Sequence, residues 1–183
     1  MQIQIISSSI RNGRESHKVA LFLKNWFNEN TDVKTNIIDL KERNYPLFHE
    51  RLSFMKEKDE EALKFSKEIS AADAVIIISP EYNGSFPASL KNVIDLLYDE
   101  WQKKPIGLAM VSSGDMAGAQ ATRDLQFVFY KIGAHVAKSR FHVGNVETSF
   151  KDDGTTENDE FYNKNAQYLW DNLLWFINAN KQN

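Results

Sequence analysis

An uninterrupted apolar run, Ala74-Val75-Ile76-Ile77-Ile78, limits the folds that are open to this chain. Consecutive apolar residues that are mostly β-branched are typical of a strand covered on both faces, as in the centre of a parallel sheet. Pro80 stops the run, Asn83-Gly84 and Pro87 follow, and apolar residues recur at helical spacing from Leu90 onwards. The segment therefore predicts a strand, a loop and a helix, in that order.

The same alternation of strand and helix recurs along the whole chain. Strands are predicted at Ile3 to Ile6, Val33 to Leu40, Ala74 to Ser79 and Ile106 to Ser112, with a last one within Ala134 to Val146. Helices are predicted at Val19 to Phe27, Leu63 to Ile69, Leu90 to Trp101, Ala121 to Ile132 and Leu169 to Ile177, whereas residues 41–54 show no clear period and are predicted to be irregular. The pattern predicts a doubly wound α/β fold with a parallel sheet. Because no linker or repeat interrupts it, we expect one domain over residues 1–183.

Composition excludes several classes of protein. The net charge is −3 and no basic stripe is visible, so nucleic acid is not an expected partner. The absence of cysteine excludes a disulfide framework and dithiol redox chemistry, so any redox function needs a borrowed cofactor. The four histidines lack metal-ligand spacing, and no metal is predicted. No segment approaches the ~20 apolar residues of a membrane span, and we expect a cytoplasmic protein that does not engage a membrane.

A polar loop rich in hydroxyl and guanidinium groups follows the first predicted strand. Ser9, Arg11, Arg14 and Ser16 lie in it, and His17 stands at the start of the next helix. Hydroxyls, arginines and the free N–H groups of a helix start are suited to a phosphate monoester. The loop matches neither the P-loop nor the Gly-x-Gly-x-x-Gly pattern. A serine-capped, solvated helix start is the alternative interpretation.

Two further loops follow the third and fourth predicted strands. In the second loop, Tyr82 offers a flat ring and Gly84 has no side chain, which suits a planar aromatic cofactor, although Asn83-Gly84 is also a common hairpin turn. The third loop begins with Ser112, Ser113 and Gly114 and ends at Gly118; its glycines let a ligand approach the backbone. Because the carboxyl ends of parallel strands meet at one edge of a sheet, we expect the three loops to converge there.

Taken together, the loops resemble those of the NADPH-dependent FMN reductase family, in the flavodoxin-like superfamily. Residues 9–16, Ser-Ile-Arg-Asn-Gly-Arg-Glu-Ser, look like the phosphate loop of that family. Residues 80–87, Pro-Glu-Tyr-Asn-Gly-Ser-Phe-Pro, continued by Leu90-Lys91-Asn92 and Asp95, look like its flavin-ring loop and the helix after it. Residues 111–114 and Gly118 look like its third loop, and the resemblance fades after about Val146.

The resemblance implies a fold and a site. The fold would be a flavodoxin-like three-layer sandwich around a five-stranded parallel sheet of order 2-1-3-4-5. FMN would bind without a covalent bond, its phosphate lying among Ser9, Arg11, Ser16 and His17. The ring would rest against Pro80, Glu81, Tyr82, Asn83 and Gly84, with Ser112, Ser113 and Gly114 closing its other side.

The resemblance also implies an FMN-dependent NAD(P)H oxidoreductase. A hydride would pass from NADPH or NADH to the flavin, and in a ping-pong cycle onward to a small acceptor: a quinone, an azo or nitro compound, a metal oxyanion or a flavin. No side chain is assigned as catalytic, because the chemistry is carried by FMN. A homodimer or homotetramer is expected. The alternatives are a flavodoxin-like electron carrier and a flavin-binding regulatory protein.

Overall fold

The chain folds around a parallel sheet whose strand order matches the prediction. The computed structural model describes residues 1–182, and of residues 139 and 140 the backbone alone. Within this part the strands are β1 Gln2–Ser7, β2 Lys34–Asp39, β3 Ala74–Pro80, β4 Pro105–Val111 and β5 His135–Val143. They pair in parallel in the order β2-β1-β3-β4-β5. The flavodoxin-like arrangement is therefore confirmed.

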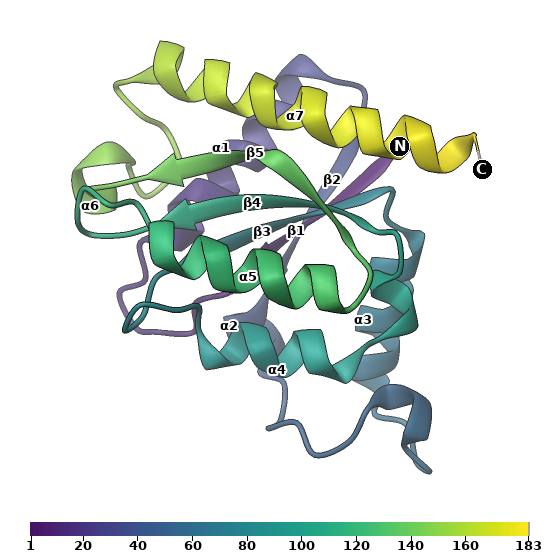
Figure 1. Cartoon of the computed structure of the whole chain (residues 1–183). Helices are drawn as coiled ribbons and strands as arrows, with labels where there is room; N and C mark the ends of the chain where they lie inside the picture. Colours follow the sequence, from purple (N-terminus) through teal and green to yellow (C-terminus); the bar gives the residue numbers. More distant parts are fainter. Residues whose placement is uncertain (183) are drawn as a thin grey trace.

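Helices cover both faces of the sheet and complete three layers (Figure 1). One face is covered by α1 (Ser16–Asn30) and α7 (Asp159–Lys181), and the other by α3 (Glu60–Ala71), α4 (Ala88–Leu96) and α5 (Ala119–Lys131). Shorter elements are α2 (Leu40–Arg43), α6 (Val146–Ser149) and the 3₁₀ turns η1 (Leu52–Phe54) and η2 (Asp99–Trp101). None of the described helices is both long and apolar enough to cross a bilayer.

The position of β3 follows from the apolar run that forms it. Successive side chains of a strand point to opposite faces. Ala74, Ile76 and Ile78 accordingly join the core under α1 and α7, whereas Val75 and Ile77 join the core under α3, α4 and α5. Every residue of β3 is buried. An unbroken apolar run is what a central strand with helices on both sides requires.

The helix that follows the second loop is shorter than its apolar spacing predicts. It ends at Leu96, and η2 follows, although Leu97 and Trp101 are buried like the helical residues before them. The indole of Trp101 lies between the rings of Phe65 and Phe129, and its Nε1 donates to the carbonyl of Ile94 at 3.1 Å. The apolar period continues past the helix end because the chain folds back into the same core.

Two short helices were not predicted. The segment expected to be irregular includes α2, which begins where Asp39 accepts a hydrogen bond from the amide of Lys41 at 3.0 Å and ends at Asn44 with φ of 46°. The other, α6, directly follows β5. Both are a single turn long, too short for an apolar period to be recognised in the sequence.

Candidate functional site

The three loops predicted to converge do meet at one edge of the sheet. The first loop (residues 8–15), the second (81–87) and the third (112–118) follow β1, β3 and β4, whose carboxyl ends lie side by side. They enclose a cleft of ≈ 160 Å³. Of the predicted site residues, the cleft is lined by Ser9, Arg11, Ser16, Pro80, Glu81, Tyr82, Ser112 and Ser113.

Some predicted site residues do not line this cleft, and some residues that line it were not predicted. His17, Asn83, Gly84 and Gly114 belong to the same loops or their borders but do not line it. Arg14, which the sequence suggested as a source of charge for a phosphate, lines the cleft as well, whereas the lining residues Gly13, Glu15, Val111, Val146 and Glu147 had not been assigned as contacts. Val146 and Glu147 begin α6, directly after β5. Their place beyond the carboxyl end of a strand was the signal that could have identified them.

Hydrogen bonds hold the first and second loops together. The hydroxyls of Ser9 and Tyr82 lie 2.6 Å apart, and Ser89 at the start of α4 donates to the carbonyl of Ser8 at 2.6 Å. The guanidinium of Arg11 lies 5.6 Å from the centroid of the Tyr82 ring, within the range of a cation–π contact. Two loops separated by some seventy residues of chain therefore act as one wall of the cleft.

Asn83-Gly84 forms a tight turn inside the second loop. The φ angles are 51° at Asn83 and 80° at Gly84, and Tyr82 and Ser85 exchange backbone hydrogen bonds of 2.7 and 3.1 Å. Two successive positive φ angles between paired residues define the I′ type of turn that Asn-Gly favours. The hairpin and the strand-loop-helix interpretations are thus both right, because the small hairpin lies within the loop that leads into α4.

Glu81 joins the second loop to β4 and α5, the elements on either side of the third loop. Its Oε2 accepts hydrogen bonds from the amides of Gln120 at 3.0 Å and Ala121 at 3.2 Å, at the start of α5. The Glu81 amide donates to the carbonyl of Val111 at 3.1 Å. A carboxylate at a helix N-terminus satisfies free N–H groups and favours the helix dipole. Although it lines the cleft, Glu81 therefore stabilises the loops themselves.

The start of α1 retains unused hydrogen-bonding capacity. Within the described residues, no side chain caps this helix, and the Ser16 hydroxyl is buried without a hydrogen-bond partner. The Arg11 side chain is exposed, and no ion pair to a carboxylate is found for it in the described part of the chain. A buried hydroxyl that lacks a partner is costly unless a ligand supplies one. Together with the helix N-terminus and a free guanidinium, it fits a phosphate group.

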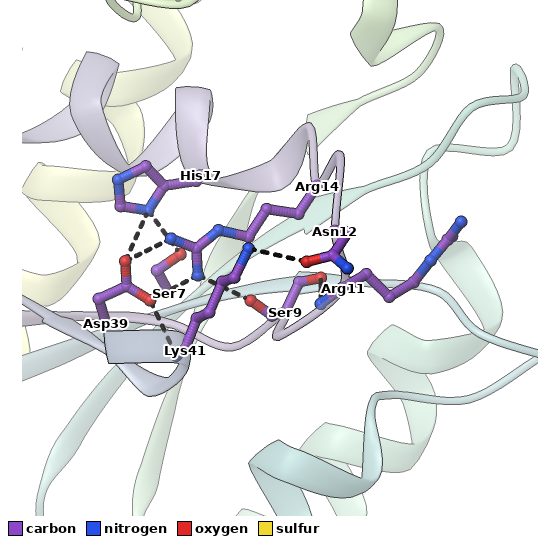
Figure 2. A network of polar contacts seen from close by, with 8 residues as sticks. All are labelled: Ser7, Ser9, Arg11, Asn12, Arg14, His17, Asp39 and Lys41. Atoms are coloured by element: carbon purple, nitrogen blue, oxygen red, sulfur yellow. Dashed lines mark hydrogen bonds and ion pairs between the residues drawn. The ribbon is translucent and has the colours of Figure 1, made fainter. Parts of the chain in front are cut away.

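The guanidinium of Arg14, whose charge suggested a contact with a phosphate, binds groups of the protein instead. It forms a two-pronged ion pair with Asp39, and its Nη1 also donates to the carbonyl of Ser9 at 2.9 Å (Figure 2). His17 faces the same cluster, with Nδ1 lying 3.0 Å from the Ser7 hydroxyl and 3.6 Å from Asp39 Oδ2. The fork of Arg14 thus binds a carboxylate of the protein, and a contact of His17 with a phosphate stays a prediction.

This cluster shifts the protonation of its members. Burial alone would raise the pKa of Asp39, but hydrogen bonds from Arg14 and from the Lys41 amide, with the nearby positive charge, hold that pKa below its ordinary value. Burial and the Arg14 guanidinium lower the pKa of His17, against the opposing effect of Asp39. At neutral pH the cluster therefore holds a carboxylate, a guanidinium and a neutral imidazole.

We expect His17 to make the protein less stable in mild acid. Because its pKa is below 6.5 in the folded state, the unfolded chain binds the proton more readily, and stability falls as pH drops below about 6.5, by at most about 1.4 kcal/mol per pH unit. Urea unfolding of His17→Gln over this range should show a shallower pH dependence than wild type. The control His49→Gln, at an exposed position, should follow wild type; equal slopes for His17→Gln and wild type would contradict the assignment.

A larger cavity lies at the opposite edge of the sheet. It measures ≈ 400 Å³ and is lined by Asp73, Lys104 and Lys181 among others. Lys104 Nζ donates to the carbonyls of Ser70 and Ala72 at the end of α3, and Lys181 pairs with Asp73 at 3.6 Å. A lysine beside helix C-terminal carbonyls is a stabilising arrangement. His135 also lines this cavity, and its Nδ1 is buried without a hydrogen-bond partner in the described residues, so a free polar group alone does not single out one edge. The carboxyl edge is the candidate site because the loops after β1, β3 and β4 converge there around Ser16 and Arg11.

The fold is that of a flavodoxin-like protein, and a candidate ligand cleft lies at the carboxyl edge of its sheet. The sequence model of the NADPH-dependent FMN reductase family matches residues 1–148. The chain therefore belongs to this family. It is an oxidoreductase with FMN as cofactor and NAD(P)H as co-substrate.

Individual relatives are similar over most of their length. The chain is 28% identical to the NAD(P)H-dependent FMN reductase LOT6 of Saccharomyces cerevisiae, over 74% of this chain and 77% of that protein. It is 26% identical to an FMN-dependent NADPH-azoreductase of Staphylococcus haemolyticus, over 95% and 94%. Among solved structures, the flavoenzyme NAD(P)H:(acceptor) oxidoreductase FerB of Paracoccus denitrificans has the same fold, with a TM-score of 0.78, 21% identity and 96% of each chain covered.

Proposed function

We propose that residues 1–183 act as one FMN-binding domain that uses the cleft between the three loops. One observation carries the proposal: the buried Ser16 hydroxyl lacks a partner in the described residues at the uncapped start of α1, beside the free guanidinium of Arg11. The cofactor phosphate would accept hydrogen bonds from these groups and from the Ser9 hydroxyl. A dianion gains most where N–H and O–H donors already point at it.

The isoalloxazine ring would lie outside the narrow cleft, against the second loop. The volume of ≈ 160 Å³ is below the ~300–1,000 Å³ typical of pockets for whole ligands, so it suits the phosphate end of FMN. Pro80 to Gly84 would support the ring on one side, with Asn83 exposed at the tip of its turn. Ser112 to Gly114 would close the other side, where Ser113 and Gly114 are exposed.

The reaction proposed is a ping-pong transfer of reducing equivalents from NAD(P)H to a small acceptor. When bound, FMN would supply the redox chemistry between NAD(P)H and the acceptor, and Ser9, Arg11 and Ser16 would hold its phosphate. The protein binds and orients the partners, and no side chain is needed as a general acid or base. The azoreductase among the relatives supports an azo compound as one acceptor class; quinones, nitro compounds, metal oxyanions and flavins are the others.

We also propose a cytoplasmic homodimer or homotetramer. The apolar segments Leu97 to Trp101 and Leu169 to Ile177 are largely explained by the core, since Trp101, Leu169 and Ile177 are buried in it. On the outer face of α7, however, Phe161, Tyr168 and Trp175 recur every seven residues with 51%, 57% and 66% of their surfaces exposed. Exposed aromatic residues on one helix face support association between protein subunits.

An anaerobic titration tests the proposed function. Protein reconstituted with FMN should lose its visible flavin absorbance when NADPH or NADH is added, because the bound flavin becomes reduced. The absorbance should return when a quinone or an azo dye is then added after removal of the nucleotide. Absorbance that stays unchanged with both nucleotides would contradict the proposal.

Steady-state kinetics separate the proposed enzyme from its alternatives. An electron carrier or a regulatory protein should oxidise NADPH with a quinone slowly, whereas a reductase turns over repeatedly. In double-reciprocal plots at several quinone concentrations, a ping-pong cycle gives parallel lines. Intersecting lines would overturn the ping-pong step while leaving the oxidoreductase activity intact.

A further inference from the structure

Asp39 lies beside the first loop, although it belongs to a different strand. It is the last residue of β2, and the pairing of the sheet places it opposite Ser7, where the first loop starts. Its carboxylate accepts both prongs of Arg14 and the amide of Lys41 (Figure 2). Only 13% of the Asp39 side chain and 11% of the Arg14 side chain are exposed. Because this pair is largely shielded from water, removing either residue would leave the charge of the other buried and uncompensated.

Arg14 extends the influence of Asp39 to the cleft. Its Nη1 donates to the carbonyl of Ser9 at 2.9 Å while both Nη atoms hold Asp39. The Ser9 hydroxyl in turn lies 2.6 Å from that of Tyr82. One line of contacts therefore joins the carboxyl ends of β2, β1 and β3, and three of its members, Arg14, Ser9 and Tyr82, line the cleft.

The charges of the two arginines are used differently. The charge of Arg14 is balanced by Asp39, whereas the described residues offer Arg11 no carboxylate, and Figure 2 shows its side chain extending away from the cluster. A planar guanidinium can hold a carboxylate with two parallel bonds and still donate to a carbonyl; a lysine ammonium cannot reproduce this fork. The guanidinium of Arg14 can therefore bind the Asp39 carboxylate and the Ser9 carbonyl at the same time.

We propose that Asp39 is a positioning residue for the cofactor phosphate, which it does not touch. Through Arg14 it fixes the Ser9 backbone and thereby the shape of the first loop. This inference rests on the proposed function. It contradicts the expectation from charge alone, under which a carboxylate next to a phosphate site weakens binding, so that its removal would tighten binding.

The test compares FMN with riboflavin, which lacks the phosphate, by titrating each into apoprotein and following flavin fluorescence. Asp39→Asn should weaken FMN binding about tenfold and change riboflavin binding less than about threefold, because the loop that meets the phosphate loses its support. Arg14→Lys, which keeps the charge but loses the fork, should do the same. The double variant should lose little more than either single variant, because both break one line of contacts.

Glu61→Gln is the matched control, since it removes a carboxylate from the separate pair with Arg43, and it should bind both flavins like wild type. Thermal melting of each apoprotein checks that it is folded. If Asp39→Asn does not fold, the FMN and riboflavin affinities of Arg14→Lys test the positioning role instead. FMN binding by either variant as tight as that of wild type, or an equal loss for both flavins, would overturn the positioning role. Wild-type protein that binds neither flavin would instead count against the proposed function itself.

Discussion

Protein carrying both Arg11→Ala and Ser16→Ala should bind FMN about a hundredfold more weakly than wild type or worse, because two hydrogen bonds to a charged phosphate are lost. Riboflavin, which has no phosphate, should bind nearly as before. Ser16 Oγ has no partner in the described residues, and the contact that Arg11 loses is a cation–π contact of its exposed side chain with the Tyr82 ring, worth about 0.5–1 kcal/mol, so the fold should be retained. Fluorescence titration of apoprotein with each flavin measures both constants.

The matched control for this pair is Arg51→Ala with Ser53→Ala, which removes the same residue types from the segment between α2 and α3. It should leave the affinities for FMN and riboflavin unchanged. If the Arg11/Ser16 variant binds FMN as tightly as wild type does, the phosphate of FMN does not bind in this cleft. Equal weakening of both flavins would mean that the two residues support the ring, or the loop as a whole.

Gly154→Ala should be among the most destabilising single-methyl changes in the chain. Gly154 is buried at φ of 85°, and an added Cβ would lie 2.7 Å from the amide nitrogen of Phe22 and 2.8 Å from Leu21 Cβ in α1. The backbone conformation costs about 1–2 kcal/mol for a non-glycine residue, and the overlap about 1–3 kcal/mol more. We expect the free energy of unfolding to fall by about 3 kcal/mol and the melting temperature by about 6–12 °C.

Gly13→Ala provides the comparison that isolates the overlap. Gly13 also has a positive φ, of 64°, but no atom lies within 4 Å of the position of its added Cβ. It should cost only about 1 kcal/mol, or about 2–4 °C in melting temperature. Similar losses of unfolding free energy at both glycines would show that backbone strain alone determines the destabilisation. The close contact between the loop before α7 and α1 would then contribute nothing.

The sequence pattern was sufficient to predict a parallel sheet and the edge where the three loops meet. Apolar runs such as that of β3 report burial on both faces, and the strand ends report where loops must gather. Helix ends were less predictable. Leu97 and Trp101 continue the apolar period of α4 because they return to the same core after the helix has ended. From Leu97 to Trp101 buried residues continue at helical spacing, although the α-helical hydrogen bonds have ended at Leu96.

Roles within the site depend on pairs that lie far apart in sequence. Arg14 and Ser9 were recognised as members of a polar loop, but nothing in that loop indicates that Asp39 balances the arginine. Glu81 was expected near the flavin ring, and its carboxylate is held by amides of α5. In both cases the residue type was informative, but its partner is set by the order of strands in the sheet, which the resemblance implied and local spacing could not.

The span of the cleft along the chain has a consequence for its biosynthesis. Its walls come from Ser9 at one extreme and Glu147 at the other. A growing polypeptide on the ribosome therefore has no finished cavity until nearly the whole sheet has emerged, because β4 must lie beside β3 before the third loop can approach the first. If FMN binds in this cleft as proposed, its uptake belongs to the end of translation or later, because a chain released early would lack the cavity that Arg11 and Ser16 line.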